Sequence, residues 1–575
     1  MEGLTDGCAL SEREREDQGK VEVKAGNKHE AAEVKQKNEK WNMLTGEVKA
    51  LLDIRPRESD MEELMNQVNE TLKTDDNLVI VSNYQNIIEE LEVTGELWED
   101  PEFLPEPSSL TYEDVAPKGI KWIRTLDLHE KAFFMTDGVS KSDIVQGELG
   151  DCWFWASVAT IANSRRLTER VIPPGQCITG KNPYYGIFRF RFWQFGNWVE
   201  ILVDDYLPTR NGQLIYARSE AGNEFWPSLF EKAFAKLHGS YKAIEGGWTL
   251  DALTDLTGGV GEMYRFSEFA DRCEELYNHL AVASKKNALM ACGTGKEDES
   301  EQSGKQDGLV AGHAYSVTAV KKLTTPRGRV PLVRILNPWG SGQNMEWTGD
   351  WSDDSPLWNQ IPIWTRESFG FTKKDDGEFW MKFDDFCEKF ANVTVLTLGP
   401  DFDGDGGADA GSLQEVKSQW VTGINAGGCR NNMIKYSCNP QYPITITETD
   451  VLSSSEEDHA DGTCSVLICL IQNYRRMDRK LGVSMNPIGI QIYKSSGPRT
   501  VLTAERFTHH TEVSDSGAYV AQRSINLRSK LPPGHYVIIP STFAPDTDGA
   551  FMLRIFTDAA IQFHDGFNLV TEGMH

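Results

Sequence analysis

The stretch QGELGDCWFWASVATIAN, residues 146–163, places a cysteine at the start of a predicted helix. Apolar residues recur at i, i+4 and i+7 from Phe154 onward, the spacing of one helix face, and Asp151 supplies a carboxylate at the helix start. Cys152 therefore lies where the positive end of a helix dipole can lower a thiol pKa. The other nine of the ten cysteines form no CxxC pair and are expected to be mostly reduced core thiols. This position makes Cys152 the candidate nucleophile.

A cysteine hydrolase also needs an imidazole, a group that orients it and a donor for the oxyanion. Gln146, six residues before Cys152, can place its side-chain amide beside the Cys152 backbone N–H. His313 lies in GLVAGHAYSV, at the start of an apolar strand. Asn337 follows 24 residues later in ILNPWGSG, where Trp339 can shield the Asn–His bond from water. The order Gln, Cys, His, Asn is that of the papain superfamily.

The composition narrows the class of partner. The chain of 575 residues has 86 acidic and 58 basic residues, a formal charge of −28, which repels phosphate backbones and argues against nucleic-acid binding. A cation such as calcium suits this charge better. No apolar stretch reaches the length of a membrane span, and the first thirty residues are too charged for a signal peptide. A cytoplasmic location is therefore expected.

Changes in amino-acid composition along the sequence divide the chain into five segments. Residues 1–94 are rich in Glu, Lys, Asp and Asn and are expected to be variable and partly disordered. Globular composition follows in 95–259 and in 260–400, separated at a Thr-Gly-Gly stretch. An acidic, Gly-rich linker fills 401–415, and 416–575 alternates strands with turns as a β-sandwich does.

Secondary structure can be placed within these segments. Helices are predicted at 225–237, with a proline in the first turn and a glycine just past the end, and near 262–283. A pair of strands around a Gly-Asn turn is predicted within 184–203, and further strands at 313–321 and 330–336.

Several strings closely resemble the calpain family. QGELGDCWFWASVATI, DGLVAGHAYSVTAV, ILNPWGSGQNMEWTGDWSDDSPLW and KKDDGEFWMKFDDF are similar to its protease core, and WVTGINAGGCRNN and KLPPGHYVIIPSTFAPDTDGAFMLRIF to its C2-like domain. The resemblance implies an α+β fold, with a papain-like core of two subdomains followed by a C2-like β-sandwich. It also implies a calcium-activated intracellular cysteine endopeptidase that makes limited, regulatory cuts in protein substrates. The WFWA string after the nucleophile is bulkier than in many relatives, with an unknown effect on the adjoining pocket.

The resemblance further implies one calcium ion in each subdomain of the core. Carboxylate and carbonyl oxygens suit calcium and are poor zinc ligands. The alternative is that these carboxylates are ordinary solvated surface groups. The implied ligands are Asp143 and Glu224 with carbonyls near Thr136 and Gly138 in the first subdomain, and Glu346, Asp353, Asp376 and Glu378 with a carbonyl near Lys374 in the second.

Calcium would explain control of the enzyme, because the cysteine and histidine lie in separate units that must close before the thiolate–imidazolium pair can form. Trp339 is the candidate wedge between the units in the calcium-free state. The run DFDGDGGADAG at 401–411 imitates an EF-hand loop, but its twelfth position is Ser412 where a bidentate Glu is required. A solvated linker is the favoured interpretation of that run.

Partners and rivals follow from the same resemblance. Larger calpains carry a penta-EF-hand domain that binds a small regulatory subunit, and since this sequence stops after the C2-like segment, no such subunit is expected. The C2-like domain is a candidate for calcium-dependent phospholipid contact and recruitment to membranes; alternatively, its acidic stretch at 456–461 clamps basic residues of the core. The rival functions are a calcium-dependent transglutaminase, which normally orients its histidine with Asp, and a catalytically silent binding scaffold. The N-terminal segment is a candidate for removal by self-cleavage.

Overall fold

The structure is a computed structural model that describes residues 84–564, apart from 114, 116, 137, 140–143, 163, 181–182, 296–306, 341–345, 400–411, 448–461 and 510. Every described residue belongs to one compact unit, Asp76–His575. Most of the predicted N-terminal segment, the EF-hand-like run and the acidic stretch at 456–461 lie outside the described residues. Among the described helices, none combines the length and the hydropathy needed to cross a bilayer.

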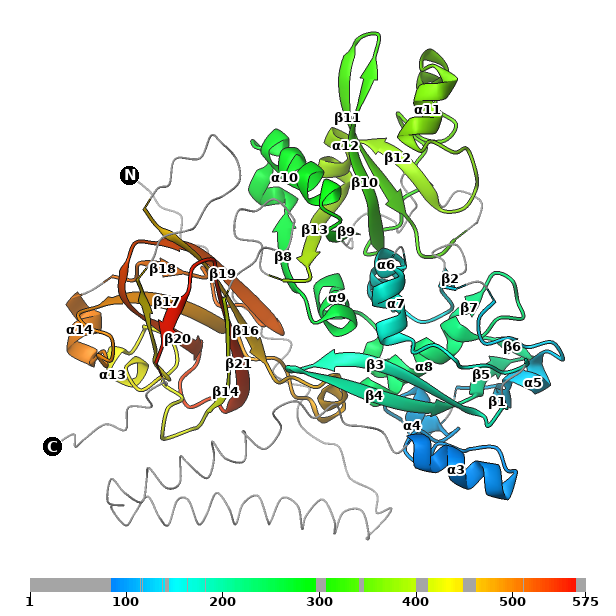
Figure 1. The fold of residues 1–575 in the computed structure, drawn as a ribbon, viewed down its shortest axis with the longest axis horizontal. Helices are drawn as coiled ribbons and strands as arrows, with labels where there is room; N and C mark the ends of the chain where they lie inside the picture. Colours follow the sequence, from blue (N-terminus) through cyan, green and yellow to red (C-terminus); the bar gives the residue numbers. More distant parts are fainter. Residues whose placement is uncertain are drawn as a thin grey trace, which may run out of the picture. The chain divides into compact units, whose positions relative to one another are not determined.

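The cysteine half, defined as the described residues between 84 and 259, is built around a buried helix. Figure 1 shows α6 beside α7 and α9, with the β3–β4 hairpin nearby. β1, β5 and β6 form a three-stranded sheet, while β2 pairs with β7 and β3 with β4. Its elements are α3 (Tyr84–Thr94), α4 (Pro107–Leu110), β1 (Ile120–Arg124), α5 (Thr125–Leu128), β2 (Ile144–Val145), α6 (Cys152–Ile161), α7 (Arg165–Val171), β3 (Ile187–Gln194), β4 (Asn197–Asp204), β5 (Tyr206–Arg210), β6 (Gln213–Leu214), β7 (Arg218–Ser219), α8 (Trp226–His238), η3 (Tyr241–Ile244) and α9 (Thr249–Thr257).

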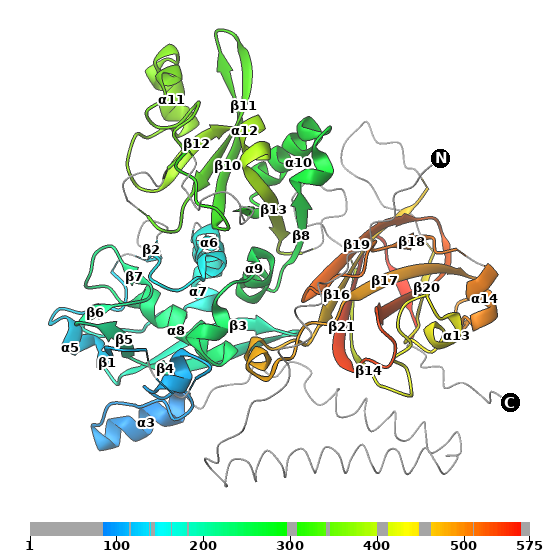
Figure 2. The same ribbon diagram turned by 180° about the vertical axis from the view of Figure 1, so that it is seen from behind.

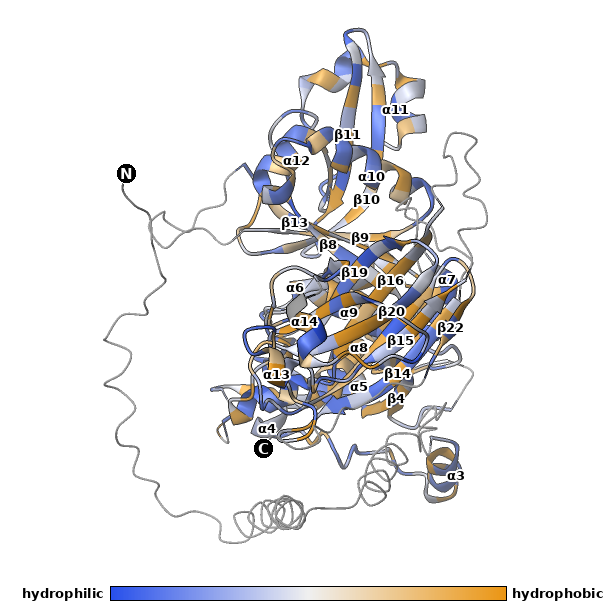
Figure 3. Ribbon diagram, turned by 90° about the vertical axis from the view of Figure 1, so that its left-hand side faces the viewer, coloured by the Kyte–Doolittle hydropathy of each residue, from blue (hydrophilic) through white to orange (hydrophobic). Residues whose placement is uncertain are grey.

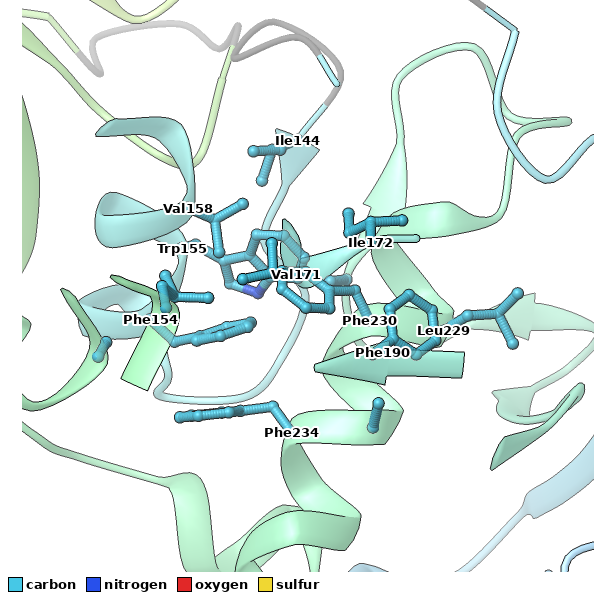
Figure 4. Close-up of a cluster of buried hydrophobic side chains, with 14 of the residues drawn as sticks. Ile144, Phe154, Trp155, Val158, Val171, Ile172, Phe190, Leu229, Phe230 and Phe234 are labelled. Carbon is cyan, nitrogen blue, oxygen red and sulfur yellow. The ribbon is translucent and has the colours of Figure 1, made fainter. Parts of the chain in front are cut away.

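The local signals in the sequence explain α8 and α6. α8 has Pro227 in its first turn and ends at Gly239, whose φ of 98° suits a residue without a Cβ. α6 is apolar all round and almost entirely buried, which is typical of a helix inside a core. Its Phe154 stacks on Phe234 of α8 with ring centroids 4.1 Å apart, as Figure 4 shows.

The histidine half, defined as the described residues between 260 and 399, is an antiparallel sheet in the order β12-β11-β10-β9-β13-β8. β10 and β11 pair as a long hairpin that closes at Thr325 and Gly328. Figure 2 shows α10 and α12 beside this sheet. Its elements are β8 (Val260–Arg265), η4 (Phe266–Phe269), α10 (Cys273–Lys285), β9 (Leu289–Thr294), β10 (Ala314–Thr325), β11 (Gly328–Leu336), η5 (Pro356–Gln360), α11 (Ile363–Phe369), β12 (Glu378–Lys382), α12 (Phe383–Lys389) and β13 (Phe390–Thr397).

The predicted helix near 262–283 is wrong in its first part. Residues Val260–Arg265 form the edge strand β8, which pairs with β13, and the helix begins only at Cys273. The Gly-Glu-Met-Tyr run carries no strong helix signal, and pairing with β13 decides its conformation.

The two halves share one core. A single cluster of buried side chains includes residues of α6 together with Ala314 of β10 and Leu336 of β11. Ser316 of β10 also donates a 2.7 Å hydrogen bond to the carbonyl of Ala156 in α6. In this state the halves are therefore packed against each other, while the histidine half also has buried clusters of its own.

The C-terminal sheets, defined as the described residues between 412 and 564, are antiparallel and enclose a common core. Four strands run in the order β14-β21-β16-β19 and five in the order β18-β17-β20-β15-β22, and both sheets contribute to one buried cluster. Figure 3 shows the hydrophobic runs of β16 and β20. The elements are β14 (Ser412–Trp420), α13 (Met433–Tyr436), β15 (Tyr442–Ile446), β16 (Cys464–Gln472), η6 (Arg476–Leu481), β17 (Ile488–Ser495), α14 (Ala504–His509), β18 (Ser514–Asp515), β19 (Ser524–Leu531), β20 (Gly534–Thr542), β21 (Gly549–Thr557) and β22 (Ile561–Phe563).

Candidate active site

Cys152 is the first residue of α6, at the position that the sequence predicts. Its side chain is largely buried, and burial raises the pKa of the thiol to about 11, although the neighbouring backbone amide of Ala314 acts in the opposite direction. Asp151 occupies the helix N-cap but makes no capping hydrogen bond with its side chain. In this state the thiol is therefore protonated and would be a poor nucleophile.

His313 lies just before β10 and is held by a buried amide. Its Nε2 is 2.9 Å from Oδ1 of Asn337, which follows β11. The same Oδ1 accepts a 3.0 Å hydrogen bond from the backbone N–H of Trp339, so it acts as an acceptor and Nε2 must carry the hydrogen. Nδ1 is then the basic nitrogen. Burial lowers the pKa of His313 to about 4, so the ring is neutral near pH 7.

In the structure the predicted nucleophile and the predicted base lie near each other but do not interact directly. Cys152 lies against the backbone N–H of Ala314, the residue next to His313. Among the described residues, however, no hydrogen bond links the Cys152 thiol to the His313 ring. The thiolate–imidazolium pair is not formed in this state, since neither partner carries its charge.

Gln146 and Trp339 contact each other across the two halves. Trp339 Nε1 donates a 2.8 Å hydrogen bond to Gln146 Oε1, and the indole lies over His313 with ring centroids 4.4 Å apart. The amide nitrogen of Gln146 donates a 2.6 Å hydrogen bond to the carbonyl of Leu149. The amide nitrogen of Gln146, the predicted oxyanion donor, is thus hydrogen-bonded to a protein carbonyl. The amide oxygen of the same side chain is held by the indole of Trp339.

The predicted calcium ligands of the cysteine half are described only in part. Glu224 is buried, and its Oε1 accepts hydrogen bonds from the backbone N–H and hydroxyl of Thr136 at 2.8 and 3.1 Å. Its Oε2 accepts from the Ser219 hydroxyl at 3.0 Å. Gly138 has a φ of 99°, while Asp143 lies outside the described residues. The Glu224 carboxylate is therefore occupied by protein donors, and it is the amide of Thr136 rather than its carbonyl that faces Glu224.

The predicted ligands of the histidine half gather on neighbouring loops. Glu346 Oε1 accepts hydrogen bonds from the backbone N–H groups of Asp376 and Gly377 at 3.0 and 2.7 Å. Asp353 Oδ2 accepts a 2.9 Å hydrogen bond from the Lys374 N–H. Burial and adjacent carboxylates raise the pKa of Glu346 to about 7 and that of Asp353 to about 6. A hard cation bound here would stabilise the negative charge of these half-buried carboxylates.

The ligand set is nevertheless not assembled. Within the part of the chain that the structure describes, no three His, Cys, Asp or Glu side chains converge as they would around a metal ion. Glu378 accepts a 2.8 Å hydrogen bond from Thr318 and pairs with Arg334 at 3.3 Å. The oxygen donors of Glu346, Asp353 and Asp376 fit calcium by type, whereas Glu378 is engaged elsewhere.

Comparison with known proteins assigns the family. A model of the calpain family cysteine proteases matches residues 98–397, and one of calpain large subunit domain III matches 416–556. The chain belongs to the calpain family. Calpain-A of Drosophila melanogaster is 39% identical over 83% of this chain and 58% of its own length, and Calpain clp-1 of Caenorhabditis elegans 38% over 81% and 59%. The calpain-1 catalytic subunit of Rattus norvegicus is 37% identical over 83% and 67%.

The chain thus spans little more than half the length of the two invertebrate calpains. Their protease core is papain-like, which agrees with the mixed helix and sheet content of an α+β fold. Among solved structures, the cysteine protease and lectin-like domains of Cwp84 from Clostridium difficile align over 83% of each chain at 11% identity, with a TM-score of 0.20. That likeness is too low to support any inference about the fold.

One buried carboxylate near Cys152, that of Glu231, escaped the sequence analysis. Asp151 and Glu231 of α8 are fully buried and contact each other, and neither Asp151 oxygen has a hydrogen-bond donor in the described structure. Burial raises both pKa values, that of Glu231 to about 7, so one proton shared by the pair satisfies the contact. The available signal was a glutamate inside the apolar run FWPSLFEKAF.

A cation from the C-terminal sheets also reaches this region. Arg476 of η6 is buried and its guanidinium lies 4.2 Å from the ring centroid of Trp153, the residue after the nucleophile. It donates a 2.8 Å hydrogen bond to the Gly246 carbonyl and pairs with Asp251 at 3.1 Å. The described contact therefore joins a basic residue of the C-terminal sheets to an acidic residue of the cysteine half. In the predicted clamp the charges were the other way round, with acidic C-terminal residues and basic core residues.

Proposed function

We propose that this chain is a calcium-activated cysteine endopeptidase that makes limited cuts in protein substrates through Cys152, His313 and Asn337. The observation that carries the proposal is the buried 2.9 Å contact between His313 Nε2 and Asn337 Oδ1, beside the helix that begins at Cys152. That contact fixes Nδ1 as the basic nitrogen. Membership of the calpain family supports the same reaction class.

Each residue has a distinct task in the reaction. Once the side chains meet, His313 Nδ1 accepts the thiol proton of Cys152, and the thiolate attacks the carbonyl carbon of the substrate peptide bond. The imidazolium then protonates the departing amine, and a water molecule deprotonated by His313 hydrolyses the thioester. Asn337 keeps the ring in the required tautomer throughout.

The oxyanion of the tetrahedral intermediate needs donors that are positioned in advance. The backbone N–H of Cys152 and the side-chain amide of Gln146 are the candidates. Because Gln146 donates to Leu149 and accepts from Trp339, both of these hydrogen bonds must break before its amide can face a substrate. The described state is thus consistent with a resting enzyme.

Calcium fits the acidic loops by donor type. Glu346, Asp353 and Asp376, with the Lys374 carbonyl, would hold one ion; Glu224 and Asp143, with the carbonyls near Thr136 and Gly138, are the candidate ligands of a second. Burial and, to a lesser extent, repulsion between carboxylates raise the pKa values of Glu346 and Asp353, and the positive charge of a bound ion would offset both effects.

The C-terminal sheets are proposed to be a C2-like β-sandwich. Two antiparallel sheets around one core and the domain III match over 416–556 support this assignment. Phospholipid contact, the absence of a small regulatory subunit and the cytoplasmic location stay predictions.

The test is cleavage of casein with and without calcium, using the wild-type chain, Cys152→Ser and the double variant Glu346→Ala with Asp353→Ala. Fragments that require both calcium and Cys152, with more calcium needed by the double variant, are the expected result. Asp354→Asn is the matched control, because this exposed carboxylate lies in the same loop. Ammonia release with amine incorporation but no fragments would favour a transglutaminase. No reaction from a folded sample would favour a scaffold.

A further inference from the structure

Two cysteines of the histidine half lie side by side, although 114 positions separate them in the sequence. Cys273 is the first residue of α10, and Cys387 lies in α12. The Cys273 side chain lies close enough to that of Cys387 to raise the pKa of the Cys387 thiol, and its own Sγ also contacts the carbonyl of Phe269 at 3.6 Å. Both are free thiols and both are partly exposed. The pair is thus reachable from solvent and is distinct from the catalytic cysteine.

The packing of the two helices gives independent support for this contact. The rings of Tyr277 in α10 and Phe383 in α12 meet edge to face with centroids 5.1 Å apart. Tyr277 lies one turn after Cys273, and Phe383 one turn before Cys387. The ring contact thus packs the two helices together within one turn of each thiol, which agrees with the proximity of the two sulfurs.

We propose that Cys273 and Cys387 are a redox modification site, which hydrogen peroxide converts to a reversible disulfide. The sulfur of Cys273 attacks one peroxide oxygen: an S–O bond forms, the O–O bond breaks, and the leaving hydroxide takes up a proton as water. The sulfur of Cys387 then attacks the sulfenic sulfur, so that the S–S bond forms and a second water leaves. The two thiols lose two electrons, which reduce one peroxide to two waters.

The surroundings of the two thiols set the order of attack. Cys273 is the first residue of a helix of 13 residues. Burial, the contact with Cys273 and the charge of Asp384 raise the pKa of Cys387. Cys273 is therefore the attacking thiol and Cys387 the resolving one.

The charges near the pair favour a neutral oxidant. Glu274 and Glu275 follow Cys273 in the first turn of α10, and Asp384 and Asp385 precede Cys387 in α12. Nearby cations are paired with carboxylates, Arg272 with Glu275, Lys382 with Asp384, and Lys389 with Asp307 and Glu388. Glutathione disulfide carries net negative charge and is repelled by this surface, whereas hydrogen peroxide is not.

The disulfide would close a loop that contains His313, Asn337 and the acidic loop at Glu346. Such a closure restricts the unfolded chain, so it should raise the unfolding temperature of the histidine half by several degrees. Neither sulfur contacts the catalytic residues in the described structure, so the modification reports on this half without blocking Cys152.

The test uses the full-length Cys152→Ser variant, so that the catalytic thiol does not consume oxidant. After brief exposure to hydrogen peroxide, remaining thiols are alkylated and the peptides are mapped by mass spectrometry. The expected product joins the Cys273 and Cys387 peptides, is lighter by two hydrogens than their sum, and separates with dithiothreitol. Adding Cys438→Ser, another partly exposed thiol, should leave this product unchanged.

Two further arms sharpen the test. In Cys152→Ser with Cys387→Ser, a dimedone adduct is expected on Cys273, because the resolving thiol is absent. Glutathione disulfide at equal concentration should yield less of the linked product than peroxide. Alkylation of Cys273 and Cys387 to the same extent as Cys438 after peroxide, or linkage of either to a different cysteine, overturns the proposal. Faster linkage by glutathione disulfide overturns the choice of oxidant. Circular dichroism of each serine variant establishes that it is folded.

Discussion

Trp339 donates a hydrogen bond of 2.8 Å from its indole Nε1 to Oε1 of Gln146, and this bond ties the histidine half to the loop before the nucleophile. The same indole lies against His313. One side chain thus contacts both His313, the proposed base, and the candidate oxyanion donor, whose amide donates to Leu149. In the proposed mechanism, release of this bond is a step of activation.

Trp339→Phe should lower the calcium concentration needed for half-maximal cleavage. Phenylalanine keeps an aromatic ring over His313 but cannot donate to Gln146, so the resting state loses one hydrogen bond, worth about 1 kcal/mol net. A shift on the order of 5-fold is expected in a calcium titration of casein cleavage. Trp364→Phe, at an exposed indole on α11, is the matched control. An unchanged or higher calcium requirement would contradict the role assigned to the bond.

Glu346→Gln should stabilise the calcium-free protein and weaken its response to calcium. The raised pKa of Glu346 reflects burial and repulsion from Asp353, Asp375 and Asp376, and a neutral amide removes that repulsion while losing a ligand. The expected result is a higher unfolding temperature without calcium and a smaller rise upon its addition, measured by scanning calorimetry. Asp354→Asn should leave both values near wild type. A lower unfolding temperature without calcium would contradict this interpretation.

Glu231→Gln should change how stability depends on pH. The folded pKa of Glu231, about 7, lies above its unfolded value, so the folded state holds a proton that the unfolded state releases. Wild-type stability should therefore fall as pH rises from about 4.3 to about 7, by on the order of 4 kcal/mol. In the variant, which carries its hydrogens at every pH, this fall should be reduced, as urea unfolding at several pH values would reveal. Identical slopes in both proteins would argue against a shared proton.

Arg476→Ala should destabilise the chain, because it leaves the buried carboxylate of Asp251 without its positively charged partner. Asp251 is buried beside the guanidinium, and removing one partner of a buried pair costs about 3 kcal/mol. The variant should unfold at a lower temperature, and the additional change Asp251→Asn should recover part of the loss. No recovery in the double variant would place the cost in the lost contact with Trp153 instead.

Local signals in the sequence predicted much of the fold. Pro227 and Gly239 bracket α8 because a fixed φ suits the first turn and a left-handed φ the end. The β3–β4 hairpin closes one residue before the predicted Gly-Asn turn, at Phe195 and Gly196, which both have positive φ, and Asn197 already belongs to β4. The strand β8 was missed because its conformation depends on pairing with β13, which lies far away in the sequence. Val260 pairs with Thr397, 137 positions later, and no local pattern encodes that contact.

The candidate site was predicted in its members but not in its state. Cys152, His313 and Asn337 were singled out by position and order, and the structure places His313 against Asn337. One of the two hydrogen bonds made by the Gln146 side chain joins it to Trp339, 193 positions away, so no local pattern could reveal it. The same holds for Glu231, whose raised pKa depends on burial against Asp151.

The most direct test is the pH dependence of Cys152 alkylation by iodoacetamide, followed by peptide mapping with and without calcium. Without calcium, burial keeps the thiol pKa alkaline, so the rate should rise only near pH 11 or with unfolding. With calcium, formation of the thiolate–imidazolium pair should move the apparent pKa well below 7, and His313→Ala should abolish that shift. An alkylation profile that is the same in both conditions, from a protein that binds calcium, would contradict calcium-dependent assembly of this catalytic pair.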